Sequence, residues 1–430
     1  MTASSVADSN VKSCGPRQLV PRGHVIAAVA IGNAIEWFEI VVFGYFAVIV
    51  AELFFPSSNS TTSLLLTLSS FGIAYVMRPL GAVVLGVYTD RKGRKAALQL
   101  SILLMALGSL TIAVAPTYST TGIAASILVV AARMLQGFSV GGEFGSATAF
   151  LAEQTEIRRG FFASWQFASQ GFAALLATGF GAVITFTLTA EQVGAWGWRI
   201  PFMFAVAIVP IGFYIRQRVS ETIEFQASRH VSSPLRSVLL HAKAGLLISL
   251  GLVVLGTVAV YTILFLPIYA VRILSLPAPN SFAAGFLTGA TQFALIPIFG
   301  GISDRLGRTL IPIVAACAIL FGVYPIFVWL SAEPTIAKLL VVQGLFGIVT
   351  AAYLGSLPAL MAELFPVRTR GTGLSISYAF GVAIFGGFTP FVHVWLIAET
   401  GNILAPAFYV ALAATVSLSS LVAARHLGFR

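Results

Sequence analysis

The chain has 430 residues, of which 58% are hydrophobic and only 9% are charged. Soluble globular proteins carry roughly 25% Asp, Glu, Lys and Arg, so this composition excludes an ordinary soluble protein and indicates one that is embedded in lipid. Helices and closed barrels are the two architectures that satisfy backbone groups in a bilayer, and apolar runs of ~20–30 residues fit helices rather than short alternating strands.

We therefore predict an all-α membrane protein of twelve transmembrane helices. A polar tail, 1–23, precedes an N-terminal six-helix half, 24–217. A cytoplasmic linker, 218–243, then leads to a C-terminal six-helix half, 244–427. The predicted spans in chain order are 24–55, 62–89, 96–116, 121–151, 161–188, 197–217, 244–273, 281–302, 309–331, 335–364, 371–397 and 402–427.

The net charge of +10 lies almost entirely on one side of these spans. The tail, the linker, the loops on the same side and the C-terminus hold 20 of the 25 Lys and Arg residues. Only Arg199, Arg272 and Lys338 fall on the other side, and Arg78 and Arg133 lie within spans. This bias predicts that both termini are cytoplasmic, and it explains the basic charge without a nucleic-acid partner.

The first span carries Asn33, Glu36 and Glu39, which are spaced by threes and spread over about 120° of one helix face. The second span carries Arg78 directly before Pro79. A charged side chain costs at least ~2.5–3.5 kcal/mol at the centre of a bilayer, so these groups are expected to face a wet cavity or one another.

The fourth span carries Arg133, Gln136 and Glu143 within about 80° of arc. A carboxylate near an arginine stays ionised until substrate or a conformational change alters the pairing, so Glu36, Glu39 and Glu143 are candidate proton-coupling groups. Arg78 and Arg133 are candidates to bind a substrate carboxylate in bidentate fashion. The alternative is a purely structural buried ion pair.

The remaining candidate substrate contacts are uncharged. In the fifth span, Trp165, Gln166, Ser169 and Gln170 form a polar stripe that favours cavity contact over a bond between helices. His393 is expected at the membrane interface, which leaves the C-terminal half without a buried acid or base. The donors that this half offers to a substrate are Tyr261, Thr262, Tyr269, Gln292, Tyr353 and Tyr378.

An internal repeat supports the division into two halves. Asp90-Arg91-Lys92-Gly93-Arg94 after the second span matches Asp304-Arg305-Leu306-Gly307-Arg308 after the eighth, at an offset of 214 residues. Leu-Ala-Glu153 matches Met-Ala-Glu363 at an offset of 210 residues, and each is followed by arginines and a glycine. Charge-assisted bonds between such loops predict a gate at the cytoplasmic ends of the helices, and the alternative is a loop that only sets topology. The predicted gating residues are Asp90, Arg91, Arg94, Glu153, Asp304, Arg305, Arg308 and Glu363.

The residues that bind metals or form disulfides are scarce. Cys14 lies in the polar tail and Cys317 in an apolar helix, and the five histidines show no ligand spacing. We therefore expect no metal and no cofactor.

The paired Asp-Arg-x-x-Gly-Arg loops resemble the signature of the major facilitator superfamily. Finer matches resemble its metabolite–proton symporter branch, which includes carriers for citrate, α-ketoglutarate, shikimate and proline/betaine. The matching segments are Gly32-Asn-Ala-Ile-Glu36-Trp-Phe-Glu39, Met77-Arg-Pro-Leu-Gly81, Arg133-Met-Leu-Gln-Gly-Phe-Ser-Val-Gly-Gly-Glu143, Trp196-Gly-Trp-Arg-Ile-Pro-Phe202 and Phe385-Gly-Gly-Phe-Thr-Pro390.

This resemblance implies proton-coupled uptake of a small polar metabolite by alternating access. We expect an inner-membrane protein that functions as a monomer, because one chain of twelve spans encloses a central site without a partner. It also implies that the acids of the first span and Arg133 take part in coupling or binding. Where this chain has Glu39 the branch usually has Asp, so the acid lies one methylene further out. Ser164-Trp-Gln-Phe-Ala-Ser-Gln170 is most similar to the citrate and tricarballylate carriers, which makes a tri- or dicarboxylate the expected substrate.

Three alternatives compete with import. A proton-coupled drug exporter usually has a Gly-Pro pair in the fifth span, and the stretch Gly171–Gly181 has no proline. A membrane-embedded enzyme needs a nucleophile–base pair or metal ligands at membrane depth, and no His-Glu-x-x-His motif is present. The third alternative, a sensor with this fold, is not excluded, because fold alone does not determine function.

Overall fold

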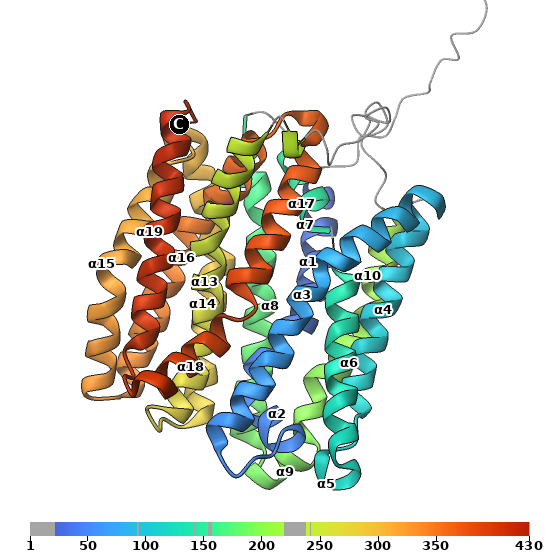
Figure 1. The fold of residues 1–430 in the computed structure, drawn as a ribbon, viewed down its shortest axis with the longest axis vertical. Coiled ribbons are helices and arrows are strands. Elements are labelled where there is room, and N and C mark those ends of the chain that lie inside the picture. The colour runs from blue at the N-terminus through green and yellow to red at the C-terminus, as the bar shows by residue number, and fades with distance from the viewer. Residues whose placement is uncertain are drawn as a thin grey trace, which may run out of the picture.

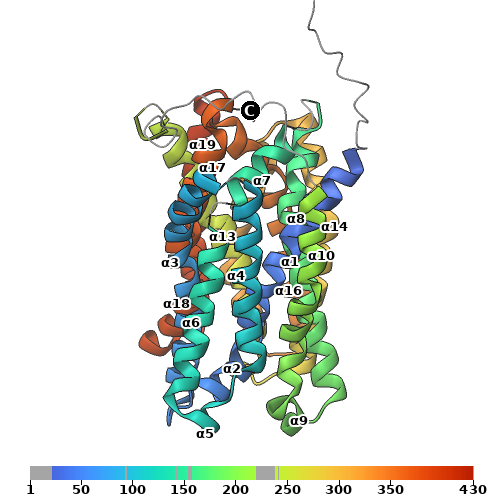
Figure 2. The same cartoon turned by 90° about the vertical axis from the view of Figure 1, so that its right-hand side faces the viewer.

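The computed structural model describes residues 22–92, 94–141, 143–153, 157–218, 238–240 and 242–429. All the regular elements in these ranges are helices, and no strand occurs among them. The long helices run side by side between two ends of the molecule (Figures 1 and 2). We call the end that carries the C-terminus the linker end, and the end that carries α2, α5 and α9 the opposite end. Most of the predicted tail and linker lies outside the described residues.

The helices fall into an N-terminal and a C-terminal group on either side of the predicted linker. The first group is α1 (Arg22–Tyr45), α2 (Ala47–Phe54), α3 (Ser60–Lys92), α4 (Arg94–Val114), α5 (Tyr118–Thr121), α6 (Ile123–Ser139), α7 (Glu143–Ala152), α8 (Arg159–Thr187), α9 (Ala190–Ala195), η1 (Gly197–Arg199) and α10 (Ile200–Arg218). The second group is α13 (Lys243–Arg272), α14 (Ala278–Leu306), α15 (Leu310–Ala332), α16 (Ile336–Glu363), η2 (Val367–Thr369), α17 (Arg370–Gly381), η3 (Val382–Gly386), α18 (Thr389–Thr400) and α19 (Ala405–His426).

Eight helical stretches in the described residues are long and apolar enough to cross a membrane by themselves. A ninth candidate is the pair α1 and α2, which bends by 64° at Phe46 where one straight span was expected. Three shorter apolar helices lie where the third, fourth and sixth spans were predicted: Gln99–Val114, Ile123–Ser139 and Gly197–Ile211.

Burial separates central helices from peripheral ones. In α13, 78% of the apolar window is buried inside the protein, whereas in α15 the share is 33%. Large apolar side chains such as Ile123, Leu247 and Phe321 are more than two-thirds exposed on the outer surface. An outer surface of this kind is stable in contact with lipid tails and not with water.

The two groups of helices meet along α8 and α14, where glycines allow the backbones to approach closely. A Cβ atom on Gly160 would lie 2.4 Å from the carbonyl oxygen of Gly300, and one on Gly289 would lie 2.5 Å from the backbone nitrogen of Leu175. We call this contact the glycine seam. Because Gly160 lies near the linker end and Gly289 lies farther along the bundle, the seam holds the two groups together over much of its length.

On the other side of the bundle, α3 packs against η3 and α18 with larger side chains. A Cβ atom on Gly387 would lie 2.4 Å from the ring of Tyr75, so the ring is pressed against backbone of the C-terminal group. The predicted eleventh span is irregular here, because the π-helical turn η3 separates α17 from α18. Such turns inside α-helices are frequent at functional sites.

Candidate functional site

A small cavity lies in the middle of the bundle, between the two groups of helices. Its volume is about 10 Å³, which is room for about one water molecule. Three of the sequence-predicted residues, Gln170, Tyr261 and Tyr378, line it. The other lining residues are Trp37, Phe167, Val253, Gly256, Thr257, Val260 and Leu357.

Two buried guanidinium groups lie near this cavity without lining it. Arg78 is 4% exposed and Arg133 is 0% exposed. The Arg78 guanidinium carbon lies 4.3 Å from the ring centre of Tyr75 and 5.6 Å from that of Trp37, which lines the cavity. Arg133 lies 4.6 Å from the ring centre of Phe43 and 5.2 Å from that of Phe71.

Most polar atoms of these two arginines have no partner. In the described part of the chain, Nε and Nη2 of both Arg78 and Arg133 make no hydrogen bond. Arg133 Nη1 instead donates to Gln136 Oε1 at 2.8 Å and to the backbone carbonyl oxygen of Ile40 at 3.5 Å. Buried positive charge with unused donors is costly unless an anion compensates it.

Aromatic rings enclose the space beside the arginines. The Tyr261 ring centre lies 5.4 Å from that of Tyr75, 5.9 Å from that of Phe71 and 6.4 Å from that of Trp37. Trp37 and Tyr75 were not among the predicted site residues. The sequence held a signal for both, since Trp37 follows Glu36 directly and Tyr75 lies one helical turn before Arg78.

Unused donors also come from uncharged side chains around the cavity. Within the described residues, the amide nitrogens of Gln170 and Gln292 make no hydrogen bond, and the hydroxyls of Tyr75 and Tyr261 lie close to each other without a bond of standard geometry. Tyr378 lies flat against Phe144, with ring centres 3.4 Å apart. The site is therefore rich in unsatisfied donors, and a ligand with several acceptor oxygens fits that chemistry.

Three other predicted substrate contacts have bonds to the protein itself. The Asn33 amide donates to the Gln166 carbonyl oxygen at 2.9 Å and to Ser169 Oγ at 2.6 Å, and the Gln166 amide donates back to Asn33 at 3.0 Å. These bonds join α1 to α8. The Tyr353 hydroxyl donates to the Leu252 carbonyl oxygen at 2.8 Å, between α16 and α13.

The acids of α1 lie on another side of the same helix. Glu36 and Glu39 are 9% and 2% exposed, and both line a separate cavity of about 30 Å³ with residues of α4, α6 and α10. Gln136 belongs to this side as well, because it contacts Ser109 of α4. The side chain of Glu143 lies outside the part of the structure that is described.

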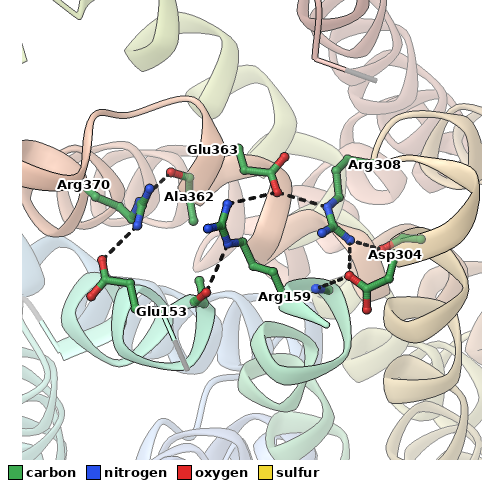
Figure 3. A network of polar contacts seen from close by, with 10 residues as sticks. Glu153, Arg159, Asp304, Arg308, Ala362, Glu363 and Arg370 are labelled. Atoms are coloured by element: carbon green, nitrogen blue, oxygen red, sulfur yellow. Dashed lines mark hydrogen bonds and ion pairs between the residues drawn. The ribbon is translucent and has the colours of Figure 1, made fainter. Parts of the chain in front are cut away.

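The linker end is held together by reciprocal ion pairs between the two groups of helices (Figure 3). Arg370 Nη1 lies 2.9 Å from Glu153, and Arg159 Nη1 lies 3.5 Å from Glu363. Arg370 Nε also donates to the carbonyl oxygen of Ala362 at 2.8 Å, and Arg159 Nε donates to that of Ala152 at 3.1 Å. Each of these alanines directly precedes the glutamate of the same group of helices. The repeated Ala-Glu motif thus forms the same contact twice, once in each direction.

Asp304 adds a different contact at the linker end. Its carboxylate accepts hydrogen bonds from the backbone N–H groups of Gly160 at 2.7 Å and Phe161 at 3.0 Å, and from Arg308 at 2.7 Å. An acid from the C-terminal group therefore caps the first turn of α8 in the N-terminal group, where a carboxylate is favoured. Arg308 also bonds Glu363 at 3.2 Å.

Two predicted gating groups stand apart from this network. Arg305 is exposed and takes part in none of the ion pairs of the described residues. The side chains of Asp90, Arg91 and Arg94 fall outside the described part. Arg159 and Arg370 belong to the network although they were not among the predicted gating residues, and their place beside the repeated Ala-Glu motif was the signal.

The opposite end contains a larger hollow between the two groups. Its volume is about 300 Å³, and Tyr45, Ile49, Pro267 and Phe282 contribute to its walls. Glu52 of α2 lies on its rim and pairs with Arg272 of α13 at 2.6 Å. With ion pairs closing the linker end, the molecule is more open at the opposite end.

His393 contradicts the sequence prediction. It was expected at the membrane interface, but its side chain is 0% exposed, and its Nε2 lies 2.9 Å from the Thr262 hydroxyl. The rings of Phe265 and Tyr409 pack against it. The prediction was wrong because α18 begins after the break at η3, which turns the residue toward α13 rather than toward lipid. The C-terminal half therefore does contain a buried base.

A lipid-facing helical bundle with a small cavity between two groups of helices is typical of a membrane transporter. The described residues include no group of three His, Cys, Asp or Glu side chains that could hold a metal ion. The sequence profile of the Major Facilitator Superfamily matches residues 29–337, and the chain belongs to this family. It is a multi-pass membrane transporter and not an enzyme.

The chain is 36% identical over 399 residues to the citrate-proton symporter of Salmonella typhi, with 92% of each chain covered. It is 31% identical to a glycine betaine/proline/ectoine/pipecolic acid transporter of Dickeya dadantii, covering 91% of this chain and 81% of that one. A D-xylose-proton symporter has the same fold, with a TM-score of 0.73 and 17% identity over 92% of this chain and 96% of that one. These findings confirm the predicted family.

Proposed function

We propose that this protein is a proton-coupled symporter that imports a small organic acid, with citrate as the best candidate. The observation that carries the proposal is the pair of buried arginines beside the central cavity, whose Nε and Nη2 atoms have no partner among the described residues. A substrate carboxylate supplies both the missing acceptors and the missing negative charge.

The number of arginines favours a substrate with more than one carboxylate. Arg78 and Arg133 lie on different helices and face different rings. Each arginine can therefore bind a separate carboxylate of the same substrate. Each guanidinium presents a planar fork that matches one carboxylate. Tyr261 and Gln170 add donors from the two sides of the cavity.

A betaine-type substrate is the second candidate, because transporters of such compounds are also relatives of this chain. A quaternary ammonium group binds over aromatic faces. Here the rings of Tyr75 and Trp37 already face the Arg78 guanidinium, at 4.3 Å and 5.6 Å. A second cation at these rings has to displace Arg78, so the site favours an anion over a zwitterion.

We assign the proton-coupling role to three acids of the N-terminal half: Glu36, Glu39 and Glu143. The first two are buried on α1, one face away from the central cavity. Buried carboxylates that exchange protons with water recur in transporters that use a proton gradient.

We further propose twelve spans, made of the eight long stretches, the bent pair α1–α2 and the three shorter apolar helices. The halves are 24–217 and 244–427, with 218–243 as linker. The concentration of Lys and Arg at the linker end supports cytoplasmic termini in a bacterial inner membrane. The lining of the central cavity comes from one chain, which supports the monomer as the working unit.

In this orientation the ion pairs of Glu153, Asp304, Arg308 and Glu363 form the closed cytoplasmic gate of an alternating-access cycle. The hollow of about 300 Å³ at the opposite end is the route from outside. Opening the gate requires these pairs to separate while the opposite end closes.

The test is uptake of radiolabelled citrate into proteoliposomes under an imposed inward proton gradient, with and without a protonophore. Unlabelled tricarballylate, α-ketoglutarate, shikimate and betaine serve as competitors. Uptake that collapses with the protonophore and is blocked by tricarballylate supports the proposal. Competition by betaine alone favours the second candidate, and no gradient-driven uptake of any compound favours an exporter or a sensor.

The ion pair at the opposite end is expected to matter little for this uptake. Glu52 is 65% exposed, and exposed ion pairs contribute about 0–1 kcal/mol. We expect Glu52→Gln to change the initial rate of citrate uptake by less than about fivefold. A larger loss in the same proteoliposome assay would show that the pair limits a step of the cycle.

A further inference from the structure

A line of hydrogen bonds connects Arg133 to Glu39 through two uncharged residues. Arg133 Nη1 donates to Gln136 Oε1 at 2.8 Å, Gln136 Nε2 donates to Ser109 Oγ at 2.8 Å, and Ser109 donates to Glu39 Oε2 at 2.6 Å. We call these four residues the relay. All four are buried, with exposed fractions of 2% or less.

The two ends of the relay lie in different surroundings, and only the Glu39 end lines a cavity. Glu39 lines the cavity of about 30 Å³ between α1, α4, α6 and α10, which has room for water and contains the polar groups of Glu36, Ser101 and Ser139. Arg133 packs on Phe71, whose ring lies 5.9 Å from that of Tyr261 on the wall of the central cavity. The relay is a bonded connection between Arg133 and Glu39 through Gln136 and Ser109.

The direction of every bond in the relay follows from the charge of Glu39. An ionised carboxylate only accepts, so the Ser109 hydrogen points to Glu39 and the Ser109 oxygen accepts from Gln136. The amide nitrogen of Gln136 therefore faces Ser109, and its oxygen faces Arg133, which can only donate. Each group has one orientation that satisfies both of its neighbours.

We propose that this relay reports the protonation of Glu39 to Arg133, with Ser109 and Gln136 as positioning residues. The inference rests on the proposed function and extends it. When Glu39 takes a proton from water in its cavity, its hydroxyl donates to Ser109 and the Ser109 hydrogen turns toward Gln136. The amide then rotates to accept that hydrogen, and its NH₂ group faces Arg133. Two donors cannot bond, so Arg133 Nη1 loses its bond to Gln136 and keeps only the longer one, 3.5 Å, to the backbone carbonyl oxygen of Ile40.

The release of Arg133 couples the proton to the substrate. A guanidinium that has lost its Gln136 acceptor offers another N–H to a substrate carboxylate, so protonation strengthens substrate binding. Linkage requires the converse, that bound substrate favours the protonated acid. The charged groups of described residues near Glu39 include Glu36 in the same cavity and Arg133 at the far end of the relay.

The first test needs no substrate. Infrared difference spectra of the protein in liposomes, between neutral and acidic buffer, should show a carboxyl band that Glu39→Gln removes. They should also show a change in the Gln136 side-chain amide band, identified by its loss in Gln136→Leu. In Ser109→Ala we expect the carboxyl band to remain and the amide change to vanish, whereas Ser109→Thr, which keeps the hydroxyl, should retain both.

The second test measures citrate affinity at the same two pH values. The ratio of the wild-type citrate affinities at the two pH values should be at least about tenfold larger than the same ratio for Ser109→Ala, since the variant loses one bond to a charged group. Comparison at equal pH removes the ionisation of citrate itself. Ser101→Ala is the matched control, because Ser101 lies on α4 in the same cavity but donates to the Ser139 carbonyl oxygen, outside the relay.

The two tests separate this inference from the proposed function. If wild-type protein shows the infrared changes but neither binds nor transports citrate, the relay stands and citrate is the wrong substrate. If Ser109→Ala is folded, as judged by its melting temperature, and keeps the amide change and the wild-type pH dependence, the relay is refuted.

Discussion

Arg133→Gln is expected to reduce citrate uptake by about 100-fold or more. Arg133 is 0% exposed, and its Nε and Nη2 have no partner among the described residues. Removing one partner of a buried charged pair costs about 2–5 kcal/mol, which corresponds to about 30-fold to several thousand-fold in affinity. The measurement is the initial rate of gradient-driven uptake at several citrate concentrations, in proteoliposomes with matched protein content.

Arg133→Lys tests whether charge alone is sufficient. Lysine keeps the positive charge but lacks the planar fork and the rigid stacking on Phe43, so we expect it to recover only part of the uptake. Arg305→Gln is the control, because it removes one positive charge from an exposed position outside the ion-pair network. Near-normal uptake by Arg133→Gln would exclude this arginine from substrate binding.

Asp304→Asn is expected to open the linker end and to slow uptake by about tenfold or more. The carboxylate accepts two backbone N–H groups at the start of α8 and one Arg308 nitrogen, and it is 7% exposed. Each hydrogen bond to a charged group contributes about 1.5–3 kcal/mol. Asparagine keeps the shape but loses the charge, so the closed state becomes less populated.

The population of the closed state can be measured with spin labels on either side of the gate. Cysteines at the exposed positions Arg158 and Leu306, in a background without Cys14 and Cys317, place one label on each group of helices. Double electron–electron resonance should show that a longer distance between the two labels dominates in Asp304→Asn. An unchanged distance distribution together with normal uptake would mean that the Asp304 cap does not hold the gate closed.

Sequence reasoning predicted the family and the buried charges of the N-terminal half, because those features depend on composition and local spacing. Arg78, Gln170, Tyr261 and Tyr378 do lie at or beside one cavity. The bend of 64° at Phe46 was not predicted, since no proline or glycine occupies that position and tertiary packing decides it.

Partner choice was the part that the sequence did not determine. Asn33 and Gln166 are as polar as Gln170, yet they bond to each other while the Gln170 amide nitrogen has no partner among the described residues. Ser109 is an ordinary serine in an apolar helix, and only its neighbours on α1 and α6 give it significance. Contacts between helices far apart in sequence carry no local periodic signal.

The central cavity has an asymmetric wall. Among the described residues near it, the two arginines come from α3 and α6, whereas α13, α16 and α17 contribute tyrosine, threonine and aliphatic groups to its lining. Divergence toward a new substrate can therefore proceed by exchanging Thr257, Val260 or Leu357 while the groups assigned to proton coupling stay untouched. Gene fusions that join this N-terminal half to the C-terminal half of a relative should inherit energy coupling from the first parent and size selectivity from the second.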